Sequence, residues 1–287
     1  MSTAATRLNA IPIFSTNDRL GANLSYHFAN LFYAHKYNLP VFFPNQSSIN
    51  SIFLDSIRLF SNKYNETAEV TKDNVQYLNN FNFNTDWYYV QARCLKAIQC
   101  DYITYFNLHF RKEFCQIIDT LAKLRGYSID YEPHKSILVH LRLNDVKKGF
   151  PEGTHETCND VYRDYINNDD YDSCVQLCPY RQASITKSKL NYLINKAQEK
   201  YPNREVILVT NPNEIIDLPY KIIANQDESL DLYLLCKSDL LISSRSTFGF
   251  MPLLFGNITE SWVPKWCHFA MFGLTTKLDK TNNLNYY

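Results

Sequence analysis

Ser136-Ile-Leu-Val-His140-Leu-Arg142-Leu143 is an apolar run that carries a histidine and an arginine near its end. The apolar residues predict a buried strand. Because side chains alternate along a strand, His140 and Arg142 are expected on the same face. Ligands of open α/β sheets bind at the carboxyl ends of the strands, where Arg142 is placed. Its planar guanidinium suits a phosphate, with which it forms paired hydrogen bonds.

Strands and helices alternate after this run. The expected strand over Glu205–Thr210 has an unbroken apolar centre, which is typical of a parallel sheet. The alternation predicts a doubly wound α/β sheet. The expected elements are a helix over Lys187–Lys200, strands over Glu205–Thr210 and Tyr220–Ala224, a helix over Ser229–Ser238, a strand over Asp239–Ser243 and a helix over Ser246–Phe255.

The first part of the chain opens with a strand, a helix and a strand, the pattern of a right-handed crossover unit. We therefore expect two Rossmann-like domains, 1–133 and 134–287, with a cleft between them. The expected elements of the first domain are strands over Ala10–Phe14 and Leu39–Phe43 and helices over Ala22–Lys36, Ile49–Phe60, Tyr88–Gln99 and Tyr102–Arg125.

The composition restricts the classes of partner. Lys and Arg together number 29, and so do Asp and Glu, which gives the 287 residues a formal net charge of zero. A nucleic-acid-binding protein usually carries a basic excess, so we expect no nucleic-acid partner. No apolar stretch approaches the roughly 18 to 20 residues of a membrane span, and the N-terminus lacks the apolar centre of a signal peptide. We expect a cytoplasmic protein without membrane insertion.

Three segments carry residues suited to an anionic ligand. In Asn17-Asp18-Arg-Leu-Gly21-Ala22-Asn23 a glycine permits a tight turn, and free N–H groups at the start of a helix can face an anion. His140-x-Arg142-x-x-Asp145 supplies a guanidinium. Ser243-Ser244-Arg245-Ser246-Thr247-Phe248-Gly249 follows a strand and opens a helix, where hydroxyls and amides make a phosphate cradle. The three together predict one shared site.

Each segment also has an ordinary structural interpretation. The first is then a turn whose Asn or Asp caps the helix, and the third is a serine cap with spare hydroxyls. The second is an ion pair between Arg142 and Asp145. No segment has the G-x-G-x-x-G spacing, so a nicotinamide or flavin cofactor is not supported.

The three segments resemble motifs of the fucosyltransferase-like glycosyltransferases of the GT-B fold. His140-Leu-Arg142-Leu-Asn-Asp145 is similar to their H-x-R-x-x-D motif, whose arginine binds the donor pyrophosphate. The segment from Asp18 to Asn23 is similar to their G-x-x-G-N-Q opening, with departures at positions 18, 19, 22 and 23. Ser229 to Gly249 is similar to the block that closes over the same phosphates. Enzymes of this kind are also similar to those with which large algal DNA viruses, the chloroviruses, decorate their capsid glycans.

This resemblance implies an inverting, metal-independent glycosyltransferase. The expected donor is a nucleotide sugar, UDP-xylose or GDP-fucose, and the acceptor is an oligosaccharide or glycoprotein, such as a viral capsid N-glycan. In a viral setting the enzyme works in the host cytoplasm. Domain 1–133 is then the acceptor side, and 134–287 binds the donor. The last helix of the chain is able to pack back on the first domain in this fold.

The resemblance also implies the roles of individual residues. Arg142 stabilises the leaving diphosphate, which makes it catalytic. Asp18 is the candidate general base, Asn23 is a further catalytic residue and His27 lies on the acceptor side. No metal and no other cofactor are expected. The implied donor-binding residues are His140, Asp145, Gly21, Ala22, Ser243, Ser244, Arg245, Ser246, Thr247 and Phe248.

Other chemistries remain open. Asp170-Tyr-Asp172 has the form of the D-x-D motif that binds a metal and a diphosphate, although no apolar strand precedes it. His155, Cys158, Cys174 and Cys178 leave a zinc site open, although their spacing matches no common zinc motif well. With 21 Tyr and 18 Phe in the chain, a non-catalytic protein that binds glycans or nucleotides is a further alternative.

Overall fold

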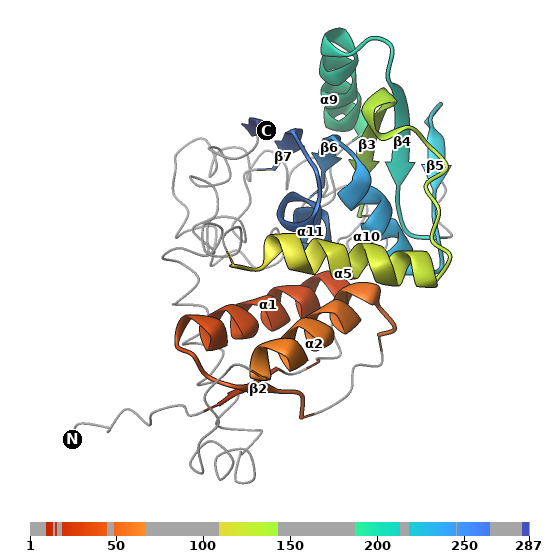
Figure 1. Cartoon of the computed structure of the whole chain (residues 1–287). Coiled ribbons are helices and arrows are strands. Elements are labelled where there is room, and N and C mark those ends of the chain that lie inside the picture. The colour runs from red at the N-terminus through yellow and green to blue at the C-terminus, as the bar shows by residue number, and fades with distance from the viewer. Residues whose placement is uncertain are drawn as a thin grey trace, which may run out of the picture. The chain divides into compact units, whose positions relative to one another are not determined.

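The chain divides into two compact units, Met1–Leu124 (unit 1) and Arg125–Tyr287 (unit 2). The computed structural model in Figure 1 describes residues 10–13, 15, 19–44, 49–66, 109–142, 187–212, 218–244, 246–264 and 283–286. The domain boundary predicted after residue 133 lies within unit 2. The expected helix over Tyr88–Gln99 lies outside the described residues.

The described residues of unit 1 form a pair of short parallel strands and three helices. The strands are β1 (Ile11–Pro12) and β2 (Val41–Phe42), and the chain between them forms α1 (Leu20–Lys36), as the strand–helix–strand pattern predicts. Helices α2 (Ile52–Asn65) and α5 (Arg111–Leu124) complete the unit. Aromatic side chains contact one another within its largely aliphatic core. The ring centroids of Phe28 and Phe114, for example, lie 4.9 Å apart at 85°.

Helix α2 is shifted along the sequence from the expected Ile49–Phe60 because polar side chains fix both of its ends. The Ser51 hydroxyl accepts a hydrogen bond from the Phe53 N–H at 3.2 Å and so caps the first turn. At the other end the Asn65 side chain accepts from the Val41 N–H at 2.9 Å and donates to the Val41 carbonyl at 2.7 Å. The last turn of α2 is therefore tied to β2.

Unit 2 is built on a parallel sheet of six strands in the order β5-β4-β3-β6-β7-β8. Every neighbouring pair in the sheet is parallel, which confirms the α/β class and is compatible with a Rossmann-like fold. The strands are β3 (Ser136–His140), β4 (Glu205–Val209), β5 (Lys221–Ile223), β6 (Leu240–Ser243), β7 (Glu260–Val263) and β8 (Asn283–Tyr286).

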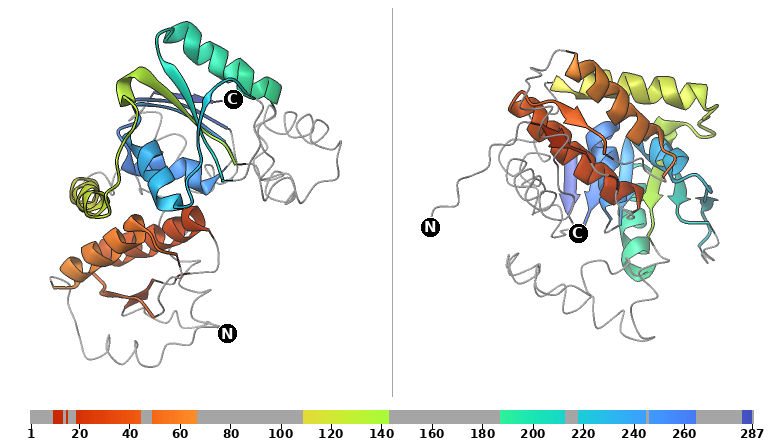
Figure 2. Two further views of the ribbon diagram at one scale, coloured as in Figure 1. Left: turned by 90° about the vertical axis from the view of Figure 1, so that its right-hand side faces the viewer. Right: turned by 90° about the horizontal axis from the view of Figure 1, so that it is seen from below.

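Helices cover both faces of this sheet (Figures 1 and 2). Helix α9 (Lys187–Lys200) lies on one face, and α10 (Glu228–Lys237) and α11 (Thr247–Phe255) lie on the other. In the described part of the chain, no helix has both the length and the apolar character needed to cross a bilayer.

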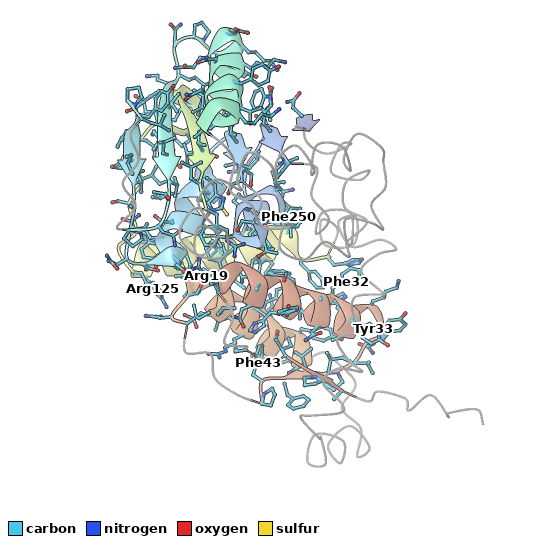
Figure 3. All side chains as sticks on the ribbon, turned by 180° about the vertical axis from the view of Figure 1, so that it is seen from behind. Arg19, Phe32, Tyr33, Phe43, Arg125 and Phe250 are labelled. Atoms are coloured by element: carbon cyan, nitrogen blue, oxygen red, sulfur yellow. The ribbon has the colours of Figure 1, made fainter. Side chains whose placement is uncertain are left out.

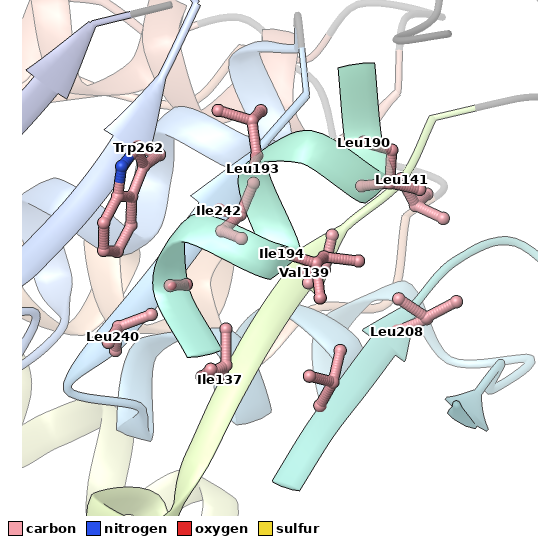
Figure 4. Packing of buried hydrophobic residues seen from close by; sticks show 12 residues of the cluster. Ile137, Val139, Leu141, Leu190, Leu193, Ile194, Leu208, Leu240, Ile242 and Trp262 are labelled. Carbon is pink, nitrogen blue, oxygen red and sulfur yellow. The ribbon is translucent and has the colours of Figure 1, made fainter. Parts of the chain in front are cut away.

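The core between α9 and the sheet follows the alternation of strand side chains (Figure 4). Alternate residues of β3, β4 and β6 meet the buried face of α9, and Trp262 of β7 joins them. The cluster consists of Ile137, Val139, Leu141, Leu190, Leu193, Ile194, Ala197, Val206, Leu208, Leu240, Ile242 and Trp262. His140 and Ser243 belong to the other set of strand positions, on the side of α11.

Charged side chains hold the amino edge of the sheet together. Glu260 of β7 is 5% exposed and accepts hydrogen bonds from Lys200 at 2.8 and 2.7 Å and from Tyr201 at 2.5 Å. The guanidinium of Arg204 binds both carboxylate oxygens of Asp239, at 2.6 and 3.1 Å. These pairs connect the α9–β4 turn to the segments that begin β6 and β7.

Candidate functional site

Two of the three predicted segments meet at the carboxyl edge of the unit 2 sheet. Strands β3 and β6 are neighbours, and His140 pairs with Ser243 in their register. The contact continues past the strands, where the Ser244 N–H donates to the His140 carbonyl at 3.1 Å. Arg142, which follows β3, and the start of α11, which follows β6, are therefore brought to the same edge.

His140 is a buried, neutral histidine that joins the two segments. It is 6% exposed, and its Nδ1 atom lies 3.1 Å from the Ser244 hydroxyl oxygen. Its ring centroid lies 5.4 Å from that of Phe248 in the first turn of α11. Burial, with a smaller contribution from the positive charge of Arg142, lowers the pKa of His140 from 6.5 to about 3. The guanidinium is thus close enough to act electrostatically on the ring.

Gly249 allows α11 to approach the sheet closely. A Cβ atom placed on Gly249 would lie 2.3 Å from the Ser243 hydroxyl oxygen and 2.5 Å from His140 Nδ1. Both distances are far below van der Waals contact, so the backbone of α11 reaches this position only because residue 249 has no side chain. The start of α11 is therefore fixed against both β3 and β6.

The predicted serine hydroxyls take part in bonds within the turn itself. Ser243 donates to the Ser244 carbonyl at 3.1 Å, and Ser246 caps α11 by accepting from the Phe248 N–H at 3.1 Å. With Ser244 held at His140, these hydroxyls position the turn. Thr247 is partly exposed in the first turn of α11, where helix N–H groups can bind an anion, and Arg142 follows β3 at the same edge of the sheet. Donor binding by the three serines stays a prediction.

Several predicted site residues fall outside the described part of the chain. They are Asp18, Asp145 and Arg245, together with the metal-ligand candidates His155, Cys158, Asp170, Asp172, Cys174 and Cys178. Among the described residues, no group of three or more His, Cys, Asp or Glu side chains is arranged to hold a metal ion.

The first predicted segment belongs to unit 1, where α1 begins earlier than expected. Helix α1 starts at Leu20 instead of Ala22, so Gly21 and Ala22 are helical and do not form the expected tight turn. The side chain of Asn23 folds back on the helix start and donates to the Arg19 carbonyl at 3.3 Å. Leu20 fits into the buried core, which accounts for the longer helix.

His27 lies on the buried side of α1, in unit 1. It is fully buried, and its Nε2 atom lies 3.4 Å from the hydroxyl oxygen of Ser15, which follows β1. Its ring packs edge-on against Phe43, at the end of β2. The implied acceptor-side role of His27 stays a prediction.

Sequence reasoning missed Asp231, a buried carboxyl in the first turn of α10. Asp231 is 6% exposed and accepts a hydrogen bond from the Asn225 amide at 2.5 Å. Burial raises its pKa from 3.8 to about 7, although the bonds from Asn225 act in the opposite direction. Because α10 follows β5, this carboxyl belongs to the carboxyl-edge side of the sheet. The signal in the sequence is a lone aspartate within Leu-Asp-Leu-Tyr-Leu.

The Asp231→Asn variant is expected to be more stable than the wild type in alkaline solution, with the gain disappearing in acid. The unfolded chain ionises Asp231 at a lower pH than the folded chain does. Wild-type stability therefore falls by about 1.4 kcal/mol per pH unit as the pH rises between the two pKa values. Asparagine removes this loss. Melting temperatures measured at about pH 4 and about pH 8 test the expectation.

The exposed Asp130→Asn variant is the control for the loss of one carboxylate. A difference between Asp231→Asn and wild type that is the same at both pH values would contradict the raised pKa.

The chain was also compared with known proteins. No protein-family model matches it, and no curated protein sequence matches it either.

Proposed function

We propose that this protein is a glycosyltransferase that takes its sugar from a nucleotide diphosphate sugar bound at the carboxyl edge of the unit 2 sheet. The observation that supports this most strongly is that Arg142 and the start of α11 follow the neighbouring strands β3 and β6 at one edge of the sheet. A guanidinium and the N–H groups of a helix start are two kinds of donor that bind the same anion.

The proposed chemistry follows from how charge moves in glycosyl transfer. As the bond to the sugar breaks, the two electrons of that bond pass to the diphosphate oxygen, which becomes more negative. Arg142 and the first-turn N–H groups of α11 stabilise that charge. His140, held neutral by burial, adds no second positive charge and keeps the turn in place. In this proposal the Arg142 guanidinium stabilises the leaving diphosphate, as a bound metal ion does in metal-dependent glycosyltransferases.

The finer parts of the proposal come from the family resemblance. Under it, the reaction is inverting, the fold is of the GT-B type, unit 2 binds the donor and unit 1 is the acceptor side. Asp18 is the proposed general base, and Asn23 and His27 are proposed to act on the acceptor side. UDP-xylose and GDP-fucose are the proposed donors, and an oligosaccharide or glycoprotein is the proposed acceptor.

A thermal-shift screen with UDP, GDP, UDP-xylose and GDP-fucose tests donor binding. A ligand present at a hundred times its Kd stabilises the folded protein by about 2.7 kcal/mol, which raises its melting temperature. We expect at least one nucleotide to do so with the wild type and not with Arg142→Ala. The absence of a shift with all four would contradict the proposal.

Donor hydrolysis then separates an enzyme from a binding protein. We expect slow release of nucleotide diphosphate from the sugar that gave the shift, and the same rate in excess EDTA. Binding without any release, with or without candidate acceptors, favours the non-catalytic alternative. Loss of release in EDTA favours the metal-dependent one.

A further inference from the structure

Arg58, on α2 of unit 1, is a cation for which the described residues supply no counter-charge. Its guanidinium carbon lies 5.6 Å from the ring centroid of Phe43. Its Nη2 atom is buried and has no hydrogen-bond partner. The ion pairs found among the described residues do not include it. Lys63, five residues further along the same helix, is by contrast paired with Glu113.

An arrangement of this kind is unfavourable unless another group completes it. Buried N–H groups, such as Nη2 of the half-buried Arg58, are almost always hydrogen-bonded in folded proteins. A guanidinium over an aromatic ring keeps its N–H groups in the plane of the fork, where the ring does not satisfy them. No described residue therefore accepts a hydrogen bond from the guanidinium of Arg58.

Arg58 lies near the carboxyl end of β2, where its guanidinium contacts the ring of Phe43. Phe43, labelled in Figure 3, directly follows β2, and Ser15 follows the neighbouring parallel strand β1. His27 contacts both, through the Ser15 hydroxyl at 3.4 Å and through an edge-on ring contact with Phe43. An arginine, an aromatic ring, a histidine and a hydroxyl thus gather where the two parallel strands of unit 1 end.

We propose that Arg58, together with Phe43, binds the carboxylate or phosphate group of a small-molecule ligand. Carboxylate and phosphate groups each present two oxygens that accept hydrogen bonds from the two sides of a guanidinium. Such a ligand would supply the acceptor that Nη2 of Arg58 lacks. Every residue of the site belongs to unit 1, so the site goes beyond the proposed donor site. If the protein is a transferase, a ligand with such a group is an acidic acceptor.

Binding of glucuronate and of glucose 6-phosphate, measured by calorimetry with glucose as the neutral reference, tests the site and separates the two anions. We expect the wild type to bind one of the two charged sugars and not glucose. Arg58→Met keeps a stem of similar length over Phe43 but removes the fork. It is expected to bind about ten- to a hundredfold more weakly, the loss associated with a charge-assisted hydrogen bond. Arg58→Lys keeps the positive charge without the planar guanidinium. Its affinity is expected to lie between those of the wild type and Arg58→Met.

Thermal unfolding of the same variants separates binding from structure. Because the Nη2 donor is buried without a partner, removing it should leave the melting temperature of Arg58→Met equal to or above that of the wild type. A structural role predicts the reverse, a lower melting temperature with unchanged affinity. Lys36→Met is the matched control, since Lys36 is an exposed cation 5.9 Å from the ring centroid of Tyr37.

The Arg142→Ala variant distinguishes this site from the donor site. We expect it to bind the charged sugar as the wild type does. The proposal is overturned if neither charged sugar binds, if Arg58→Met binds as tightly as the wild type, or if Lys36→Met loses as much affinity. It is also overturned if only Arg142→Ala abolishes binding, because the anion then sits in unit 2.

Discussion

The Arg142→Ala variant is expected to lower the rate of sugar transfer about a hundred- to thousandfold, the typical effect of removing one preorganised donor to a developing negative charge. Arg142 follows β3 at the edge of the sheet where α11 begins after β6. Steady-state rates with the nucleotide sugar identified by thermal shift measure the effect. Arg142→Lys should recover only part of the rate, because an ammonium lacks the planar fork.

Two controls show whether the effect is local. Lys196 is an exposed cation on α9, and Lys196→Ala should transfer sugar at the wild-type rate. Loss of the Arg142 charge should also raise the pKa of His140, which NMR titration of its ring can follow. A folded Arg142→Ala protein with wild-type turnover would remove Arg142 from the mechanism.

The Gly249→Ala variant is expected to destabilise unit 2 and to remove donor binding at the same time. The new Cβ would lie 2.3 Å from the Ser243 hydroxyl oxygen and 2.5 Å from His140 Nδ1. Both side chains are buried, and His140 is held by Ser244, so the start of α11 has to move away from the sheet. Overpacking of this kind typically costs about 1–3 kcal/mol. Chemical denaturation and nucleotide binding measure the two effects.

Gly126→Asn is the contrasting substitution in the same unit. Gly126 has a φ of 71°, and a Cβ placed there meets no atom within 4 Å. Asparagine tolerates this left-handed conformation better than most residues, so the variant should stay close to wild-type stability and bind nucleotide normally. Equal stability losses at 249 and 126 would show that the close approach of α11 is unimportant.

The sequence predicts four strands of unit 2, β3, β4, β5 and β6, from their apolar residues. β3, β4 and β6 are buried in the middle of the sheet, and their apolar runs reveal them. β7 and β8 escaped prediction because Glu-Ser-Trp-Val and Asn-Leu-Asn-Tyr contain too few apolar residues. Glu260 is stable inside β7 only because Lys200 and Tyr201, remote in sequence, supply its hydrogen bonds.

The site was predictable in its residue types but not in its internal bonds. The sequence placed His140 and Arg142 at the end of one strand and a serine-rich turn after another. That the two strands are neighbours depends on the sheet order, which local patterns do not contain. The close approach of Gly249 depends on that same order, and so does the use of the Ser244 hydroxyl to hold His140. Asp231 was missed because its burial comes from tertiary packing.

The ion pairs that stabilise the unit 2 sheet lie at its amino edge, whereas the candidate site lies at its carboxyl edge. Glu260 is bound by Lys200, Tyr201 and Asn285, and Arg204 is bound to Asp239, so fixed charges join α9, β4, β6, β7 and β8 at that edge. At the opposite edge, the described residues around His140 meet through hydrogen bonds and a ring contact. Residues that face a ligand there can change over evolutionary time, and specificity with them, while the ion pairs of the amino edge keep the sheet in shape.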